Sequence, residues 1–295
     1  MSRARERAAG TLPVVGLVYP CDALALQAAG AIVDAGIARP LLIGPPAVIV
    51  NAALAAGVSP HRFEIVATTD DPRAAAERAA ALAAEGALDA MMKGSLHTDE
   101  LMSAVVRKSS GLRSARRITH AFVFDLPRYP KLLAVADCVV NIAPNLPTKR
   151  DIVRNAVELL QCMGIGMPKV GIVAAVETVS PAIPATLDAH ALVEMSREGA
   201  FPGAVVEGPL GFDNVISAEA ARIKKIESRV AGDVDLIVVP DLNAGNILYK
   251  SFNYIGGGDC AGLVLGAKVP VVLTSRADSL QARVASVALA ALASR

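Results

Sequence analysis

Residues 14–44 read VVGLVYPCDALALQAAGAIVDAGIARPLLIG and contain one complete repeat of an α/β fold. The apolar run 14–19 predicts a strand, 22–35 keeps apolar residues at helical spacing, and 41–44 predicts the next strand. Strands that are apolar on both faces, joined by a helix, are typical of a parallel sheet covered by helices. This stretch therefore predicts an α/β fold.

The same alternation continues along the chain. Further strand-like runs lie at 63–66, 90–92, 120–124, 132–135, 139–142, 170–174, 204–207, 236–239, 263–265 and 269–273. Helices are predicted at 71–85, 148–163, 184–198, 217–229 and 279–293. About a dozen strands would make an unusually wide single sheet, so we expect two lobes. The basic, Gly- and Ser-containing stretch RKSSGLRSARR at 107–117 is the expected hinge or exposed lobe boundary.

Composition excludes several classes of protein. The chain has 295 residues, 53% of them hydrophobic, and a formal net charge of +1. That balance offers no electrostatic reason to expect a nucleic-acid or anionic-membrane partner, and the apolar runs are too short or too broken to span a bilayer. The scattered cysteines favour reduced thiols over disulfides or a zinc site. Without a signal-peptide core after the basic N-terminus, a cytoplasmic enzyme is expected.

Polar residues follow several predicted strands at the point where ligands bind in open α/β sheets. Lys93-Gly94-Ser95 follows the strand at 90–92, and a helix opens near Thr98. Unpaired N–H groups and a lysine favour an anion there, although an ordinary strand-to-helix turn has the same pattern. Lys149 and Arg150, in the first turn of another helix, oppose the helix dipole and indicate either an anion site or a solvated face.

Two later loops contain short polar side chains. Asp213 and Asn214 follow the strand at 204–207, where they either hold a substrate group or form turns with their own backbone. Asn243 and Asn246 flank Gly245 after the strand at 236–239. The Gly256-Gly257-Gly258-Asp259 run that follows lacks the spacing of a dinucleotide-binding loop.

The last predicted strand delivers a hydroxyl, a guanidinium and a carboxylate within one turn. Thr274, Ser275, Arg276 and Asp278 follow it before the final helix begins. Such a set can bind a phosphate and a carbonyl and move one proton; an N-cap with an Arg–Asp pair is the structural alternative. The nucleophile elbow GxSxG is missing, and no cluster of carboxylates with His has metal-ligand spacing.

Taken together, these segments resemble the phosphate acetyl/butyryltransferase family. Seven blocks run in family order: MKGSLHTDELM (92–102), ARRITHAFVFDLP (115–127), NIAPNLPTKRDIV (141–153), AAVETVSPAIPATLDA (174–189), GPLGFDNVISAEAARIK (208–224), VVPDLNAGNIL (238–248) and LTSRADS (273–279). The resemblance implies reversible conversion of acyl-CoA and inorganic phosphate into acyl phosphate and CoA, without a metal or redox cofactor. It also implies a homodimer.

The implied architecture is two-lobed and similar to isocitrate and isopropylmalate dehydrogenases, with the active site in the cleft between the lobes. The first lobe would comprise residues 1–112 and 278–295, and the second residues 113–277. The resemblance makes Ser275 and Arg276 catalytic, with Asp278 as the available carboxylate, since Gln281 and Ala282 stand where the acetyl-specific branch has its Asp. Lys93, Thr98, Asp213, Asn214, Asn243 and Asn246 are the substrate-binding candidates.

Two alternatives have the same architecture. A decarboxylating dehydrogenase would need a set of carboxylates for a divalent metal and a nicotinamide-binding loop, which the sequence does not show. A relative that binds acyl-CoA without turnover would not need the Ser275–Arg276 pair. Basic residues of the 107–117 stretch, such as Arg107 and Lys108, either meet the CoA phosphates or form a solvated face.

Overall fold

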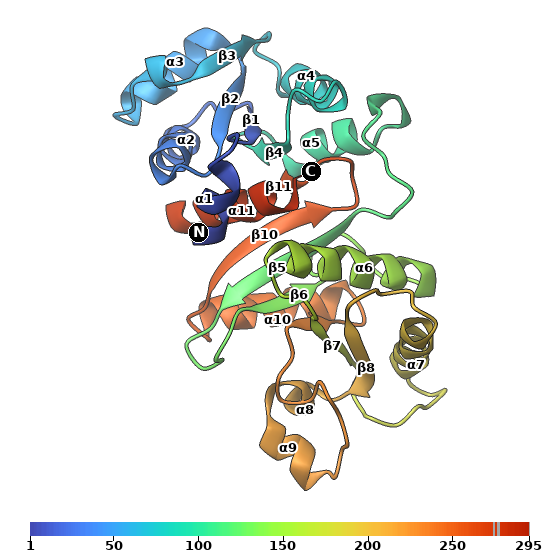
Figure 1. Ribbon diagram of the computed structural model, residues 1–295. Helices are drawn as coiled ribbons and strands as arrows, with labels where there is room; N and C mark the ends of the chain where they lie inside the picture. Colours follow the sequence, from blue (N-terminus) through green and yellow to red (C-terminus); the bar gives the residue numbers. More distant parts are fainter. Residues whose placement is uncertain (274, 276–277, 295) are drawn as a thin grey trace. The chain divides into compact units, whose positions relative to one another are not determined.

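The computed structural model describes residues 1–273, 275 and 278–294. Packing contacts divide the chain into two compact units, Met1–Arg116 with Ala261–Arg295, and Arg117–Cys260 (Figure 1). The chain thus returns to the first unit at Ala261, ahead of the expected position 278. Each unit has its own layered arrangement of strands and helices.

The first unit is built on strands in the order β3-β2-β1-β4-β11-β10. The pairs among β3, β2, β1, β4 and β11 are parallel, and β10 is antiparallel to β11. The strands are β1 (Val14–Val18), β2 (Arg39–Gly44), β3 (Glu64–Ala67), β4 (Ala90–Lys93), β10 (Asp259–Leu265) and β11 (Val271–Val272). The helices are α1 (Ser2–Ala8), α2 (Ala23–Ala35), α3 (Pro46–Ala55), α4 (Pro72–Ala84), α5 (Thr98–Val106) and α11 (Leu280–Ala293), with single 3-10 turns at Pro60–Arg62 and Lys108–Ser110.

Capping residues define where these helices begin. The Asp22 carboxylate accepts a hydrogen bond from the Ala25 N–H, and Asp71 does the same for Arg73 ahead of Pro72. Ser279 caps α11 through the Ala282 N–H. Helix α11 packs on α2 and α1 and buries Val287, Ala290 and Ala291 among others. The last helix of the chain therefore completes the core of the first unit.

The second unit has the strand order β5-β6-β9-β7-β8. Strands β6, β9, β7 and β8 pair in parallel, and β5 is antiparallel to β6. The strands are β5 (Thr119–Asp125), β6 (Leu133–Ala136), β7 (Lys169–Val173), β8 (Val205–Leu210) and β9 (Leu236–Val238). The helices are α6 (Leu146–Cys162), α7 (Pro184–Arg197), α8 (Phe212–Ile216), α9 (Ala218–Ile223) and α10 (Leu242–Tyr254).

A separate hydrophobic core holds the second unit together. Phe124, Leu133, Val135, Val234 and Ile237 are fully buried members of it. Helix α10 adds aromatic contacts, since Tyr249 stacks on Phe122 at 4.6 Å between ring centroids and Phe252 meets Phe124 edge-on at 5.3 Å. This unit therefore has the interior of an independent domain.

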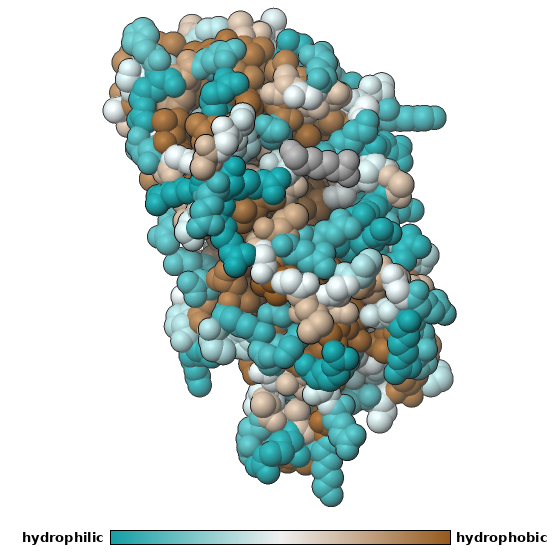
Figure 2. All heavy atoms as spheres, viewed as in Figure 1, coloured by the Kyte–Doolittle hydropathy of each residue, from teal (hydrophilic) through white to brown (hydrophobic). Residues whose placement is uncertain are grey.

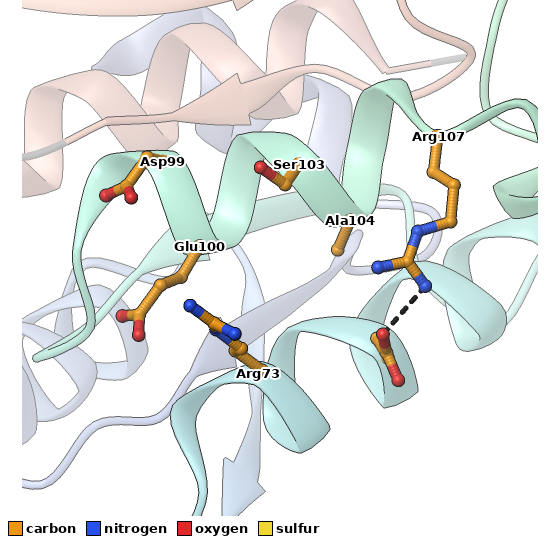
Figure 3. Close-up of a pocket in the computed structure, with 7 residues that line it drawn as sticks. Arg73, Asp99, Glu100, Ser103, Ala104 and Arg107 are labelled. Carbon is orange, nitrogen blue, oxygen red and sulfur yellow. Dashed lines mark hydrogen bonds and ion pairs between the residues drawn. The ribbon is translucent and has the colours of Figure 1, made fainter.

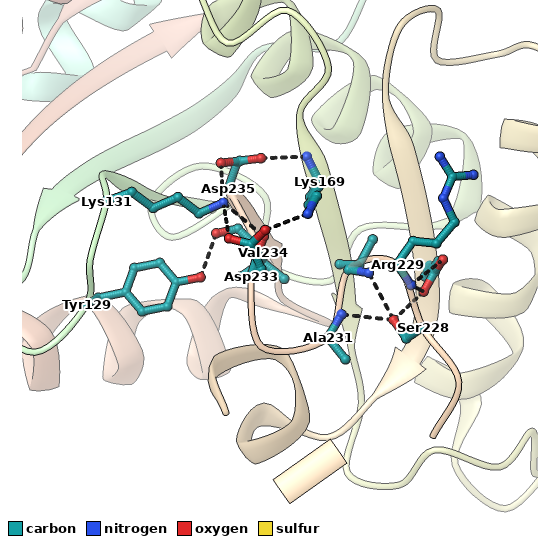
Figure 4. A network of polar contacts seen from close by, with 11 residues as sticks. Tyr129, Lys131, Lys169, Ser228, Arg229, Ala231, Asp233, Val234 and Asp235 are labelled. Atoms are coloured by element: carbon teal, nitrogen blue, oxygen red, sulfur yellow. Dashed lines mark hydrogen bonds and ion pairs between the residues drawn. The ribbon is translucent and has the colours of Figure 1, made fainter. Parts of the chain in front are cut away.

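The amino ends of β6, β7 and β9 are joined by charged side chains (Figure 4). Lys131 lies 2.7 Å from Asp233 and 2.8 Å from Asp235, and Lys169 pairs with Asp233 as well. The Tyr129 hydroxyl donates to the Val234 carbonyl at 2.7 Å. This network ties the amino ends of the strands together. We expect ligands to bind at the opposite edge, where the carboxyl ends of the strands lie.

One expected strand is wrong. Residues 139–142 are not a strand, because Asp137 Oδ1 accepts hydrogen bonds from the N–H groups of Val139 and Val140 and bends the chain there. The expected α/β class and its mostly parallel strands are confirmed.

The helices of the described residues include none long and apolar enough to cross a bilayer, and Figure 2 shows hydrophilic side chains over much of the face in view.

Candidate active site

The carboxyl ends of β1, β4 and β11 lie next to one another in the first unit. Val18 is paired with Lys93, and Met92 with Val272. The segments that follow these strands therefore begin at the same edge, which is where open α/β sheets bind ligands. Lys93, Ser275 and Asp278, predicted from separate stretches of sequence, are thus brought to one end of the sheet.

The Lys93–Ser95 loop is shaped by close backbone approach. A Cβ on Gly94 would lie 2.5 Å from the Val18 carbonyl oxygen and 2.6 Å from that of Tyr19, so only glycine fits. The half-buried Lys93 ammonium donates to the carbonyls of Gly94 at 3.3 Å and Leu96 at 3.1 Å. These bonds hold a positive charge at the strand end.

Asp22 and Ser95 join the loops after β1 and β4. The Ser95 hydroxyl donates to Asp22 Oδ2 at 2.7 Å, and Ser95 Oγ accepts from the Cys21 N–H at 2.9 Å. Tyr19, just before them, has a left-handed φ of +52°, a conformation that costs energy for a residue with a side chain and often marks a functional segment. From the sequence, Asp22 is expected only to begin a helix.

Cys21 is not suited to nucleophilic chemistry. Burial, together with the negative charges of Asp70 and Asp22, raises the pKa of its thiol to about 12. A thiol with that pKa stays protonated at neutral pH, whereas the thiolate is the reactive form.

Ser275 and Asp278 form a hydrogen-bonded turn between β11 and α11. The Ser275 N–H donates to Asp278 Oδ2 at 2.6 Å, and the Asp278 N–H donates to the Ser275 carbonyl at 3.2 Å. The Ser275 side chain is exposed. Thr274 and Arg276, expected in the same turn, lie outside the residues that the structure describes.

Arg283 is a buried residue of α11 that was not predicted from the sequence as part of the site. Its Nη2 donates to the Ser275 carbonyl at 2.7 Å and its Nε to the Asp278 carbonyl at 3.4 Å. Burial lowers the pKa of the guanidinium, while the charges of Asp278 and Asp22 act in the opposite direction. An arginine in the first turns of a helix, where the dipole disfavours a cation, was the available signal.

Thr98 is the first residue of α5 and is exposed. The N-cap is His97, whose backbone N–H donates to the Glu100 carboxylate at 2.8 Å. Thr98 is the first helical residue after the loop that follows Lys93, so in sequence it lies near the carboxyl end of β4.

The other predicted binding residues belong to the second unit. Asp213 and Asn214 follow β8 in α8, where Lys224 lies 2.9 Å from the Asp213 carboxylate and 2.7 Å from that of Glu177. The hydrogen bond from Lys224 lowers the pKa of Asp213. Asn214 is fully buried and lies 3.5 Å from the Lys224 ammonium. These residues therefore form a small ionic cluster at the carboxyl ends of β7 and β8.

Asn243 and Asn246 lie in the first turns of α10, which is capped by Asp241. Asn246 donates to the Cys138 carbonyl at 3.4 Å, and Asn243 is exposed. Gly245 is required between them, since a Cβ there would lie 2.6 Å from the Asp137 carbonyl oxygen. The loops after β6 and β9 therefore meet closely.

A buried histidine and aspartate adjoin these loops. Asp137 Oδ2 accepts a hydrogen bond from the backbone N–H of His120 at 3.2 Å and one from the side-chain amide of Asn141 at 2.6 Å. Burial lowers the pKa of the His120 imidazole to about 4, against a smaller opposing effect of Asp137. Nδ1 of His120 makes no hydrogen bond within the described part of the chain.

The basic side chains that suggested anion sites have carboxylate partners. Lys149 lies 2.7 Å from Asp188, and Arg150 lies 3.1 Å from Asp151. Arg107 lies 2.7 Å from Glu77 in a surface pocket of about 300 Å³ that also contains Arg73 and Glu100 (Figure 3). The pocket has both signs of charge, so it does not single out an anion.

Comparison with known proteins extends over most of the chain. The family model described as "Phosphate acetyl/butaryl transferase" matches residues 73–291. A phosphate acetyltransferase of Rhizobium meliloti is 50% identical over 281 residues, which are 95% of this chain and 89% of that protein. A phosphate butyryltransferase of Clostridium acetobutylicum is 40% identical over 87% of this chain and 85% of its own length.

Solved structures show the same fold. A branched-chain phosphotransacylase from Enterococcus faecalis superposes with a TM-score of 0.84 at 29% identity, covering 96% of this chain and 99% of that chain. A 4-hydroxythreonine-4-phosphate dehydrogenase from Burkholderia phymatum reaches a TM-score of 0.58 at 14% identity, over 96% of this chain and 98% of that chain. The dehydrogenase therefore shares the fold alone.

Proposed function

The chain belongs to the phosphate acetyl/butyryl transferase family, and we infer from this that it moves a short acyl group reversibly between CoA and inorganic phosphate. The forward reaction converts acyl-CoA and phosphate into acyl phosphate and free CoA. The observation that carries this conclusion is the near full-length similarity to transferases named for acetyl and for butyryl groups.

The reaction requires two anions to meet. An oxygen of phosphate attacks the thioester carbonyl carbon, and the carbonyl oxygen takes up negative charge. When that oxyanion collapses, the carbon–sulfur bond breaks and CoA leaves as a thiolate that gains a proton. Fixed cations and hydrogen-bond donors stabilise both the phosphate and the oxyanion.

We propose that Ser275, Arg276 and Asp278 are the catalytic residues. Ser275 would donate a hydrogen bond to the oxyanion, and Arg276 would bind phosphate or the carbonyl oxygen. Asp278 would accept the proton of the CoA thiol in the reverse direction. The turn that joins Ser275 and Asp278 at the end of β11 supports this assignment, because ligands of such sheets bind where the strands end.

Lys93 and Thr98 are proposed to bind the anionic substrates, since the ammonium of Lys93 is held at the same strand edge as Ser275. Asp213, Asn214, Asn243 and Asn246 are proposed as binding residues of the second unit. Their place at the carboxyl ends of β8 and β9 supports that role.

Three further properties complete the proposal. The enzyme would need no metal or redox cofactor, would act as a homodimer and would reside in the cytoplasm. Activity that persists after dialysis against a chelator would support independence from a metal. Light scattering coupled to size-exclusion chromatography would give the mass of the assembly and so test the homodimer.

The decisive experiment measures free thiol released from acetyl-CoA, propionyl-CoA and butyryl-CoA, with and without phosphate. We expect phosphate-dependent release that is lost in a Ser275→Ala, Arg276→Ala double variant. The three rates also rank the acyl chains, whose discrimination by a pocket is worth about 1–3 kcal/mol for a methylene difference. Absence of release from every acyl-CoA would overturn the assignment for those substrates.

A further inference from the structure

Arg283 has an unusual position for a stabilising residue. It lies in the first turns of α11 and is 5% exposed, so its charge is withdrawn from water close to the positive end of a helix dipole. Both circumstances disfavour a cation. An apolar side chain at this place would incur neither cost, which points to a purpose in the contacts that the guanidinium makes.

The hydrogen bonds of Arg283 indicate that purpose. Two nitrogens of its planar group reach the backbone carbonyls of Ser275 and Asp278. Because the donors of a guanidinium are rigidly spaced, they fix the separation of the two carbonyls. The Ser275 N–H is bound to the Asp278 carboxylate in turn. Arg283 therefore holds both Ser275 and Asp278, the two described residues of the proposed catalytic set.

Asp22 relates the same arginine to the Lys93–Ser95 loop. The negative charge of Asp22 favours the charged form of Arg283, and Asp22 Oδ2 accepts the hydroxyl hydrogen bond of Ser95. The carboxylate whose charge acts on Arg283 thus also anchors the loop after β4.

We infer that Arg283 is a positioning residue for acyl transfer, which sets the geometry of the Ser275–Asp278 turn without touching the substrates. This inference rests on the proposed function. A side chain that acts in this way changes the rate of the chemical step more than it changes substrate binding, since small misplacement of catalytic groups costs up to about 10²-fold in rate.

The test compares Arg283→Met, Arg283→Lys and Arg283→Ala with a control on the same helix. Ser286 is also buried; its Oγ accepts from the Gly262 N–H at 3.0 Å and donates to the Ala282 carbonyl at 2.8 Å, so neither of these bonds involves Ser275 or Asp278. Ser286→Ala therefore reports the effect of weakening α11 alone. Each variant is measured for kcat and KM with acyl-CoA and phosphate, per mole of folded protein determined by urea unfolding.

We expect Arg283→Met to lower kcat by about 10- to 100-fold, with little change in either KM, and Ser286→Ala to keep the parent kcat. Lysine offers a single point charge in place of the fork, so Arg283→Lys should recover only part of the rate. Added guanidinium or methylguanidinium should restore part of the kcat of Arg283→Ala.

Several outcomes overturn the inference while leaving the proposed function intact. One is a folded Arg283→Met protein with the parent kcat. Another is an equal loss of kcat in Ser286→Ala. If Arg283→Met does not fold, a folded Arg283→Lys protein with the full parent kcat has the same meaning. A parent enzyme that releases no thiol from acyl-CoA contradicts the proposed function itself.

Discussion

At the scale of single residues, burial determines the charge state of His120. His120 is 1% exposed, and its Nδ1 has no hydrogen-bond partner among the described residues. Its neutral form is therefore the one that the native structure accommodates.

We predict a stability loss at mildly acidic pH that originates at His120. Burial lowers its pKa from 6.5 to about 4. Between these pH values the unfolded chain binds a proton that the native chain does not. The contribution of neutral His120 to the free energy of unfolding is therefore complete above pH 6.5 and is lost as the pH falls to about 4. The contribution is at most about 3 kcal/mol.

Urea unfolding of the parent and of His120→Asn at several pH values between 7.5 and 4 checks this. The variant should lose less stability than the parent on acidification, whatever its stability at neutral pH. Identical pH dependences would contradict the assignment to His120.

Gly94 provides a second prediction at this scale. A Cβ there would lie within 2.6 Å of the carbonyl oxygens of Val18 and Tyr19, which are backbone atoms of the sheet and its connecting loop. Gly94→Ala should therefore destabilise the protein by about 1–3 kcal/mol and should lower acyl-transfer activity by displacing Lys93.

Gly166→Ala is the matched control, because nothing lies within 4 Å of a Cβ at that position. Denaturant unfolding and thiol release are measured on both variants. Equal stability of the two would show that the close approach at Gly94 is not as described.

At the scale of elements, the periodic pattern of the sequence was sufficient for most strands and several helices. β1, β5 and β6 lie close to their expected positions. The expected strand at 139–142 is wrong because the side chain of Asp137 competes for backbone N–H groups. Helices α1, α3, α8 and α10 were not predicted. Apolar residues crowd α3, and short polar residues lie in the first turns of α8 and α10, where they resemble a loop.

The positions of the candidate site residues could likewise be predicted only in part. Polar groups directly after an apolar strand, such as Lys93 and Ser275, could be singled out from the sequence, since strand ends are where sheets bind ligands. Arg283 was missed: its place near a helix N-terminus is a weak signal in the sequence, and its contacts with Ser275 and Asp278 exist only once the turn has folded back onto α11. Asp22 resembled an ordinary cap, and only its contact with Ser95 shows more.

The link between α6 and α7 leads to a prediction about elements. Lys149 in α6 has a side chain only 7% exposed and pairs with Asp188 of α7, which is 31% exposed. Asp188→Asn leaves a buried ammonium without its counter-charge, so we expect a loss of about 1–3 kcal/mol, less than for a fully buried pair.

Lys149→Met should cost less than Asp188→Asn, because methionine is apolar and leaves only the more exposed partner unpaired. Urea unfolding of both single variants and the double variant measures the interaction as a thermodynamic cycle. Additive effects in the double variant would contradict the pairing.

At the scale of the whole molecule, the two units differ in how they are assembled from the chain. The second unit is continuous, Arg117–Cys260, whereas the first combines Met1–Arg116 with Ala261–Arg295. Strand β11 and helix α11 supply the missing neighbours of β4, α1 and α2.

We therefore predict that residues 117–260 fold by themselves, with a cooperative urea transition, because they contain a complete core. Residues 1–116 alone should not, since the surfaces that α11 covers would be exposed. Amide dispersion in NMR spectra and denaturant titrations distinguish the two cases. A native-like spectrum from 1–116 would contradict the prediction.

The split arrangement of the first unit also has a consequence for biosynthesis. A ribosome makes residues 1–116 before the second unit, whereas α11 and the turn that contains Ser275 and Asp278 are made after it. Since domains fold as units during translation, the continuous second unit can form on the nascent chain while the first awaits its final helix. Acyl transfer would then begin only after α11 has been made, so a polypeptide that stops before α11 would be inert.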